Sequence, residues 1–106
     1  MPFIALEELE VREPVEGYRA KFVHSDGMTL AHWVVEAGAE LPEHSHPHEQ
    51  VVNVVDGEFE LTIDGVTQAM HPGWVAVIPP NAVHSGKAIT ECRLIDAFHP
   101  TRDDYR

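Results

Sequence analysis

Residues 38–57 read Gly-Ala-Glu-Leu-Pro-Glu-His-Ser-His-Pro-His-Glu-Gln-Val-Val-Asn-Val-Val-Asp-Gly, with three histidines within five residues. His44 and His46 are two residues apart, so on a β-strand they point to the same face. Pro47 has no N–H and favours a turn or a strand edge, so the alternation is not extended through His48. Neutral imidazole is the commonest protein ligand for transition metals. The stretch therefore predicts a metal site; the competing interpretation is a solvated, histidine-rich loop.

The strand that follows adds Gln50 to this site. Asp56-Gly57 is a strong signal for a two-residue hairpin turn. The residues after it alternate apolar (59, 61, 63) with polar, so their apolar face must point inward. Across such a turn Gln50 lies on that same inner face, where His44 and His46 can also point. The turn predicts these cross-strand pairs: Val55 with Glu58, Val54 with Phe59, and Val52 with Leu61.

A fourth ligand candidate, His84, lies behind the turn-like segment Pro79-Pro80-Asn81. Asparagine tolerates a positive φ better than most residues, which suits a tight bend that presents this histidine. The working hypothesis is a mononuclear metal site built from His44, His46, Gln50 and His84.

The rest of the chain has the texture of a β protein. Gly and Pro turns are frequent, Asp64-Gly65 is a second hairpin signal, and Ser85-Gly86 is interpreted as a further break. About eight short strands with little helix indicate an all-β antiparallel barrel or jelly roll, whose interior would enclose a ligand cavity. A short helix or arm is expected before Pro14, and a loop or single helical turn after residue 99. The clearest expected strands are residues 18–24, 28–36, 50–55, 58–63, 66–70, 74–78 and 91–98.

Length and composition limit the function classes. A chain of 106 residues suits one domain, residues 1–106, with one core. The formal charge of −11 argues against nucleic-acid binding, since only seven Lys and Arg are present and they are scattered. The sequence predicts neither a signal peptide nor a membrane span. Cys92 is the single cysteine; it fits a reducing cytoplasm and is interpreted as a small buried residue rather than a nucleophile.

The last strand places an acid among apolar residues. Asp96 shares its face with Leu94 and Phe98, where desolvation and a nearby cation shift its proton affinity in opposite directions. It is a candidate general acid/base, with a buried structural aspartate as the alternative. Arg102 is a candidate clamp for a substrate carboxylate, or else a tail residue paired with Asp103 or Asp104. His48 is interpreted as a spare ligand, a partner of a ligand, a proton shuttle or a solvent-facing residue. His24 is interpreted as an ordinary surface or strand residue, and Trp33 and Trp74 as packing residues.

At this point two spaced motifs resemble a known family, the cupins. The first is Gly38, His44-x-His46, Gln50 and Gly57; the second is Gly73, Pro79-x-Asn81 and His84. The resemblance implies a double-stranded β-helix barrel, commonly a dimer, with a metal held by three histidines and one carboxylate. Gln50 stands where Glu is usual and Asn81 where Gly is usual. With a neutral Gln50 a divalent ion keeps its formal charge of +2, which makes it a stronger Lewis acid. The donors suit Ni, Zn, Fe, Mn or Co without choosing among them.

The end of the chain narrows the resemblance. Residues 92–105, together with Pro-Pro-Asn-x-x-His-Ser and His-Pro-His-Glu-Gln, are similar to the small pectin-degradation cupins of the KdgF type. Those enzymes are associated with turning 4,5-unsaturated monouronates from pectin or alginate into the linear 4-deoxy-5-keto form. The resemblance makes Asp96 and Arg102 catalytic or substrate-binding, makes Phe98 a pocket wall, and predicts a small anionic sugar acid as substrate. An iron-dependent dioxygenase and a non-catalytic cupin that binds a small acid remain the alternatives.

Overall fold

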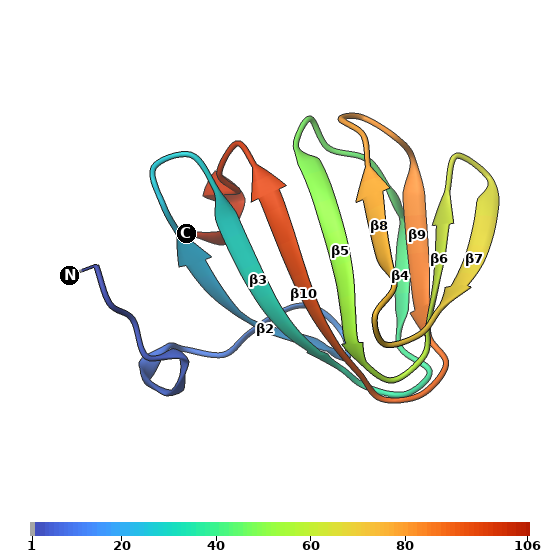
Figure 1. Cartoon of the computed structure of the whole chain (residues 1–106), viewed down its shortest axis with the longest axis horizontal. Helices are drawn as coiled ribbons and strands as arrows, with labels where there is room; N and C mark the ends of the chain where they lie inside the picture. The colour runs from blue at the N-terminus through green and yellow to red at the C-terminus, as the bar shows by residue number, and fades with distance from the viewer. Residues whose placement is uncertain (1) are drawn as a thin grey trace.

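Two antiparallel β-sheets face each other across one core in the computed structural model, which describes residues 2–106 (Figure 1). The six-stranded sheet has, in order, β1 (Arg12–Val15), β2 (Tyr18–His24), β3 (Thr29–Val35), β10 (Cys92–His99), β5 (Glu49–Asp56) and β8 (Val75–Ile78). The four-stranded sheet has β4 (Glu40–His44), β9 (His84–Ala88), β6 (Phe59–Ile63) and β7 (Val66–Met70). Two 3-10 turns complete the described chain, η1 (Leu6–Glu8) and η2 (Asp103–Tyr105). The predicted all-β jelly roll is confirmed.

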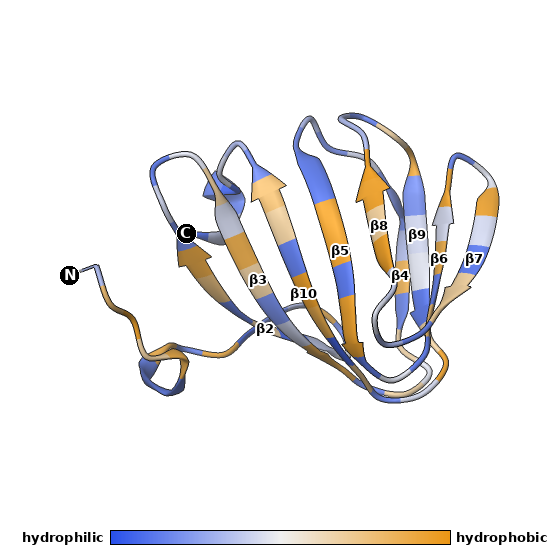
Figure 2. Cartoon of the chain, in the orientation of Figure 1, coloured by the Kyte–Doolittle hydropathy of each residue, from blue (hydrophilic) through white to orange (hydrophobic). Residues whose placement is uncertain are grey.

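Side-chain alternation along the strands builds the core. β10 buries every second residue, so Cys92, Leu94, Asp96 and Phe98 all face inward, as expected from their two-residue spacing. Figure 2 shows that β5 and β8 are largely apolar, whereas β4 and β9 are more polar. The polar pair carries His44 and His84, so this part of the interior is specialised for something other than packing.

The predicted hairpin at Asp56-Gly57 is wrong, although the faces that it assigned are right. β5 pairs with β10 and β8, while β6 pairs with β7 and β9, so the chain crosses from one sheet to the other at Gly57. None of the cross-strand pairs expected across that turn is formed. Gly57 has φ 84°, and a Cβ there would lie 2.2 Å from the carbonyl oxygen of Glu91. The glycine thus permits a close backbone approach, and turn chemistry alone does not reveal which strands pair.

Other local signals fare differently. The Asp64-Gly65 hairpin is confirmed by the pairing of Ile63 with Val66, and Asn81 adopts φ 65° as expected. The predicted break at Ser85-Gly86 is wrong, because both residues lie inside β9. A Cβ at Gly86 would lie 2.5 Å from the Phe59 ring, so this glycine makes room for a neighbouring side chain within a strand.

The N-terminal residues form an arm that ends in an edge strand. The arm contains one 3-10 turn and then β1, which includes Pro14. The expected arm is present, but a strand across Pro14 was not predicted; β1 forms there because an edge strand tolerates a residue without an N–H. Part of the predicted arm, Met1, lies outside the described residues. No helix within residues 2–106 has the length and apolar character needed to cross a membrane.

Candidate metal centre and active site

Three histidines from different segments meet inside the barrel. His44 ends β4, His84 begins β9, and His46 lies in the loop between β4 and β5. One ligand atom from each lies within 4.8 Å of the others. Metal–nitrogen bonds are about 2.1 Å long, so two ligands of one ion lie up to about 4 Å apart and a single ion could draw all three together. The spacing predicted that His44 and His46 share a strand. His46 instead lies in the loop that follows, but its ring reaches the same cluster.

Each imidazole is oriented by its own stretch of backbone. The Nδ1 atoms face carbonyl oxygens, which only accept hydrogen bonds, so Nδ1 carries the proton and Nε2 keeps its lone pair. This is the arrangement found around metal-binding histidines, where the second ring nitrogen is bonded to a carbonyl or carboxylate. The three bonds are His44 to Pro42 at 2.8 Å, His46 to His48 at 3.0 Å, and His84 to Ala82 at 2.9 Å.

Gln50 completes the candidate ligand set. Its Nε2 donates to Oδ2 of Asp96 at 3.0 Å, which turns its Oε1 toward Nε2 of His46, also at 3.0 Å. Oε1 of Gln50 and Nε2 of His46 are both acceptors, so they face each other without a proton between them. Nε2 of His84 is buried and has no partner among the described residues. A bound cation would satisfy all three atoms, so the residues present fit a metal.

Burial keeps the histidines of this cluster neutral, which is the form that binds a metal. Desolvation, with Arg102 adding to it, lowers the pKa of His46 to about 4. Burial likewise lowers the pKa of His84. Both rings are therefore neutral at pH 7, as metal binding requires.

Asp96 lies beside this cluster, on β10. It is 6% exposed, and its Oδ2 accepts hydrogen bonds from Gln50 and from the indole N–H of Trp33 at 3.1 Å. Burial raises the pKa of Asp96 to about 7, although these two bonds and Arg102 oppose the shift. Its Oδ1 is buried without a partner. The carboxyl is therefore poised to give or take a proton at Oδ1 near neutral pH.

Arg102 approaches from the segment after β10. Its Nε and Nη2 donate to Asp104 at 3.0 and 2.8 Å, so the predicted pairing with a neighbouring aspartate is present. The guanidinium nevertheless lies inside, 8% exposed, and packs over the rings of Phe98 at 4.8 Å and Tyr105 at 4.3 Å. Nη1 does not take part in the pairing with Asp104, so this edge of the guanidinium faces the cavity, where it can meet an anion.

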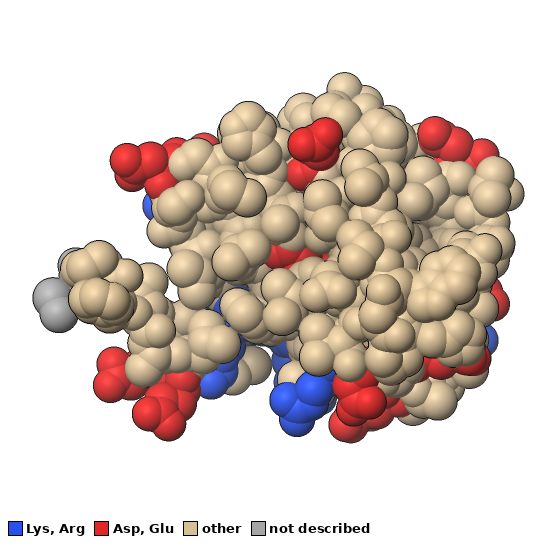
Figure 3. Space-filling model, in the orientation of Figure 1, with Lys and Arg blue, Asp and Glu red and all other residues tan. Residues whose placement is uncertain are grey.

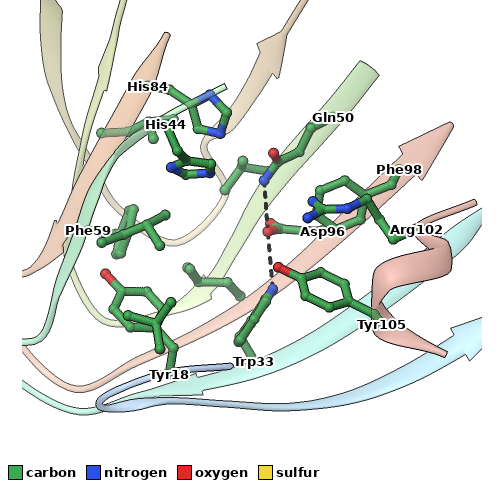
Figure 4. A pocket seen from close by; sticks show the side chains of 15 residues that line it. Tyr18, Trp33, His44, Gln50, Phe59, His84, Asp96, Phe98, Arg102 and Tyr105 are labelled. Atoms are coloured by element: carbon green, nitrogen blue, oxygen red, sulfur yellow. Dashed lines mark hydrogen bonds between the residues drawn. The ribbon is translucent and has the colours of Figure 1, made fainter. Parts of the chain in front are cut away.

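All of these groups except His46 line one cavity between the sheets, shown in Figure 4. The cavity has a volume of about 50 Å³, enough for an ion and a few waters, so an organic ligand would extend beyond it. The figure shows the histidines on one side and Asp96, Phe98, Arg102 and Tyr105 on the other, with Gln50 between them. The polar lining residues are Tyr18, Trp33, His44, Gln50, His84, Asp96, Arg102 and Tyr105.

Sequence reasoning missed two contributors. Trp33 was interpreted as a packing residue; it does pack in the core, but its N–H also bonds to Asp96. Tyr105 was not considered, because a lone aromatic residue in a short turn has no periodicity. His24 was interpreted as an ordinary strand residue, yet it bonds to the carbonyl oxygen of Tyr105.

The remaining candidates lie outside the cavity. Cys92 is fully buried and its Sγ donates to the backbone of Glu58 and Thr90, which confirms a small buried residue. His48 is partly buried, and its Nε2 lies 3.2 Å from the carbonyl oxygen of Thr101. It thereby links the histidine-rich loop to the segment that carries Arg102.

Comparisons with known proteins agree with this fold. Residues 31–98 match the family described as the cupin domain. The chain is 28% identical to the pectin degradation protein KdgF of Dickeya dadantii (strain 3937) over 102 residues, 93% of each chain. It superposes on an RmlC-like cupin from Shewanella frigidimarina NCIMB 400 with a TM-score of 0.94 and 30% identity, covering 100% of this chain and 96% of that one. KdgF from Halomonas sp. gives a TM-score of 0.92 and 28% identity, with 100% and 99% coverage.

Proposed function

The chain belongs to the cupin family, and from that premise we propose that it is a metal-dependent enzyme that converts 4,5-unsaturated uronates, from pectin or alginate breakdown, into linear 4-deoxy-5-keto uronates. One observation carries the proposal: three histidines and Gln50 converge at a cavity that also holds a carboxyl with its pKa near 7 and a buried arginine. The likeness to two KdgF proteins over nearly the whole chain supports the substrate class.

Each group has a role that its surroundings favour. A divalent transition metal held by His44, His46, Gln50 and His84 would supply a Lewis acid for a substrate oxygen. Arg102 would bind the substrate carboxylate through its free edge, because the protein is strongly acidic and an anion needs local positive charge. Phe98 would form the wall behind it. Asp96 would take up and return the proton that moves during ring opening, at its unpartnered Oδ1.

We also propose that the protein is a homodimer. The outer face of the six-stranded sheet exposes several aliphatic side chains, and contiguous apolar surface is typical of an interface. On the face seen in Figure 3, charged side chains lie mainly at the margins. Sedimentation velocity would test the assembly, and a monomer at micromolar concentration would contradict it. The exposed residues are Leu30, Val34, Val75 and Val77 on that face, with Phe3 and Ile4 on the arm.

The deciding experiment is turnover of 4,5-unsaturated galacturonate, followed by NMR with and without a chelator. The uncatalysed opening is the control. Chelator-sensitive acceleration would support both the reaction and its metal dependence. Absence of acceleration by metal-replete protein would refute the proposed reaction. Oxygen consumption with Fe(II) would then indicate a dioxygenase, and saturable binding without turnover a binding protein.

A further inference from the structure

The segment after β10 brings the hydroxyl of Tyr105 to the cavity, in addition to the carboxyl of Asp96. Tyr105 lines it together with Asp96 and Arg102, and Figure 4 shows its hydroxyl directed toward Asp96 and Trp33. The guanidinium of Arg102 lies over the face of the ring, 4.3 Å from its centroid, and also reaches the hydroxyl. Arg102 can only donate to this hydroxyl, so the proton of the hydroxyl itself is left for a ligand.

The tyrosine ring is firmly positioned. Phe22 stacks on it with centroids 4.4 Å apart and planes at 23°. Arg102 lies over the ring as well; two groups this close to the centroid must occupy opposite faces. The Tyr105 ring is therefore held on both faces, and Phe98 contacts Arg102 from a direction roughly perpendicular to the Tyr105 ring, with the two ring centroids 6.4 Å apart. Cation–π contacts of this kind stabilise both partners.

Hydrogen bonds from distant strands fix the backbone of the same turn. Arg12 and His24 both donate to the carbonyl oxygen of Tyr105. The other nitrogen of His24 faces the hydroxyl of Thr29 at 2.8 Å, and that hydroxyl accepts the N–H of Arg102 at 2.9 Å. With Nε2 of His24 protonated, every donor in this series of hydrogen bonds has an acceptor. Such a network specifies one position for the turn and for the ring.

We propose that Tyr105 is a catalytic residue that donates a proton to the ring oxygen of the substrate while Asp96 accepts the proton of the anomeric hydroxyl. This inference rests on the proposed function. Opening a cyclic hemiacetal moves protons at two oxygens, whereas Asp96 offers only Oδ1, because its Oδ2 already accepts from Gln50 and Trp33. Burial, partly offset by Arg102, raises the pKa of Tyr105, so its hydroxyl is protonated at pH 7.

The proposed cycle conserves protons and electrons. Asp96 removes the anomeric proton, the C1–O bond of the ring breaks as the C1 carbonyl forms, and Tyr105 protonates the departing ring oxygen to give an enol. Asp96 then delivers its proton to C4, while the tyrosinate takes back the enol proton and the C5 ketone forms. The net change moves one proton from the anomeric oxygen to C4, and both side chains regain their starting states.

The test is Tyr105→Phe, which keeps the ring and its stack but removes the hydroxyl. We expect kcat to fall about 100-fold, with KM within about threefold and with metal content and thermal midpoint unchanged. Tyr105→Ala also removes the stack that holds Arg102, so it should raise KM in addition. Asp103→Asn is the matched control in the same turn, because its side chain bonds to Thr101 and Arg106 rather than to the cavity.

The outcomes separate this inference from the proposed function. A wild-type protein that does not accelerate the opening refutes both. A wild-type protein that is active, with Tyr105→Phe equally active, refutes only the role of Tyr105 and makes it a wall of the pocket. Loss of kcat in Tyr105→Phe with KM and metal retained supports the inference.

Discussion

The two sides of the cavity are held in place by different means. On the metal side, each histidine bonds to a carbonyl two residues away in sequence. On the acid side, the bonds are long-range: Asp96 to Trp33 spans 63 residues, Arg102 to Thr29 spans 73, and Tyr105 to His24 spans 81. On the metal side, local sequence thus orients each ring, although the pairing of β4 with β9 brings His44 to His84. On the acid side, both the orientation and the assembly depend on distant strands.

Removing a metal ligand should have the largest effect. His84→Ala is expected to strip the metal and reduce turnover to the uncatalysed rate, because the Nε2 of His84 is a buried metal-binding atom with no other partner. Metal content by mass spectrometry and turnover by NMR would check this. His32→Ala, on the outer side of β3, is the control and should keep its metal. Full metal content in His84→Ala would overturn the four-ligand assignment.

On the acid side, the two functions should separate. Asp96→Asn is expected to retain metal while turnover falls about 10²- to 10⁴-fold, because a general acid/base is lost. The same two assays apply. If turnover is unchanged, Asp96 is a structural residue. If metal is lost as well, the two sides are coupled through Gln50 and the contrast between them weakens.

Asp96 should also leave a mark on stability against pH. Its pKa is about 7 in the folded protein and about 3.9 when unfolded. Between these values the folded state holds more protons, so the contribution of Asp96 to stability falls as pH rises. An asparagine at this position does not titrate, so Asp96→Asn does not lose stability in this way. The unfolding free energy of the variant minus that of the wild type should therefore rise between pH 4.5 and pH 8, by roughly 1–4 kcal/mol.

Urea unfolding of both proteins in EDTA would measure that change. The low pKa of His46 acts in both proteins and cancels in the difference. A pH-independent difference would show that the Asp96 carboxyl is already ionised throughout this range.

The smallest effect is expected from an anchor of the acid side that does not touch the cavity. Thr29→Val leaves the buried N–H of Arg102 without its acceptor, at a cost of about 1–3 kcal/mol. We expect a several-fold higher KM and normal metal content, measured by kinetics and urea unfolding. Thr67→Val, at an exposed position, should change stability by less than about 0.5 kcal/mol. An unchanged KM in Thr29→Val would mean that the aromatic stack alone positions Arg102.

The fold class was predictable because it depends on local signals. Alternation of apolar residues assigned the inner faces of β5, β6 and β10, and positive φ at Asn81 followed from its chemistry. Strand partners were not predictable at Asp56-Gly57, where a turn signal marks a crossover between sheets. β9 was missed because Gly86 resembles a break and yet accommodates the Phe59 ring, a contact between residues far apart in sequence.

The sequence by itself therefore determined the all-β class, since a period of two requires no long-range information, and the two spaced motifs named the histidines, which the pairing of β4 with β9 brings together. Only the tertiary structure decided the surroundings of Asp96, the stacking of Arg102 and the presence of Tyr105 in the cavity. Those features depend on which strands become neighbours, and burial and hydrogen bonding then set each group's chemistry. No side chain reveals this desolvation until the strands around it are in place.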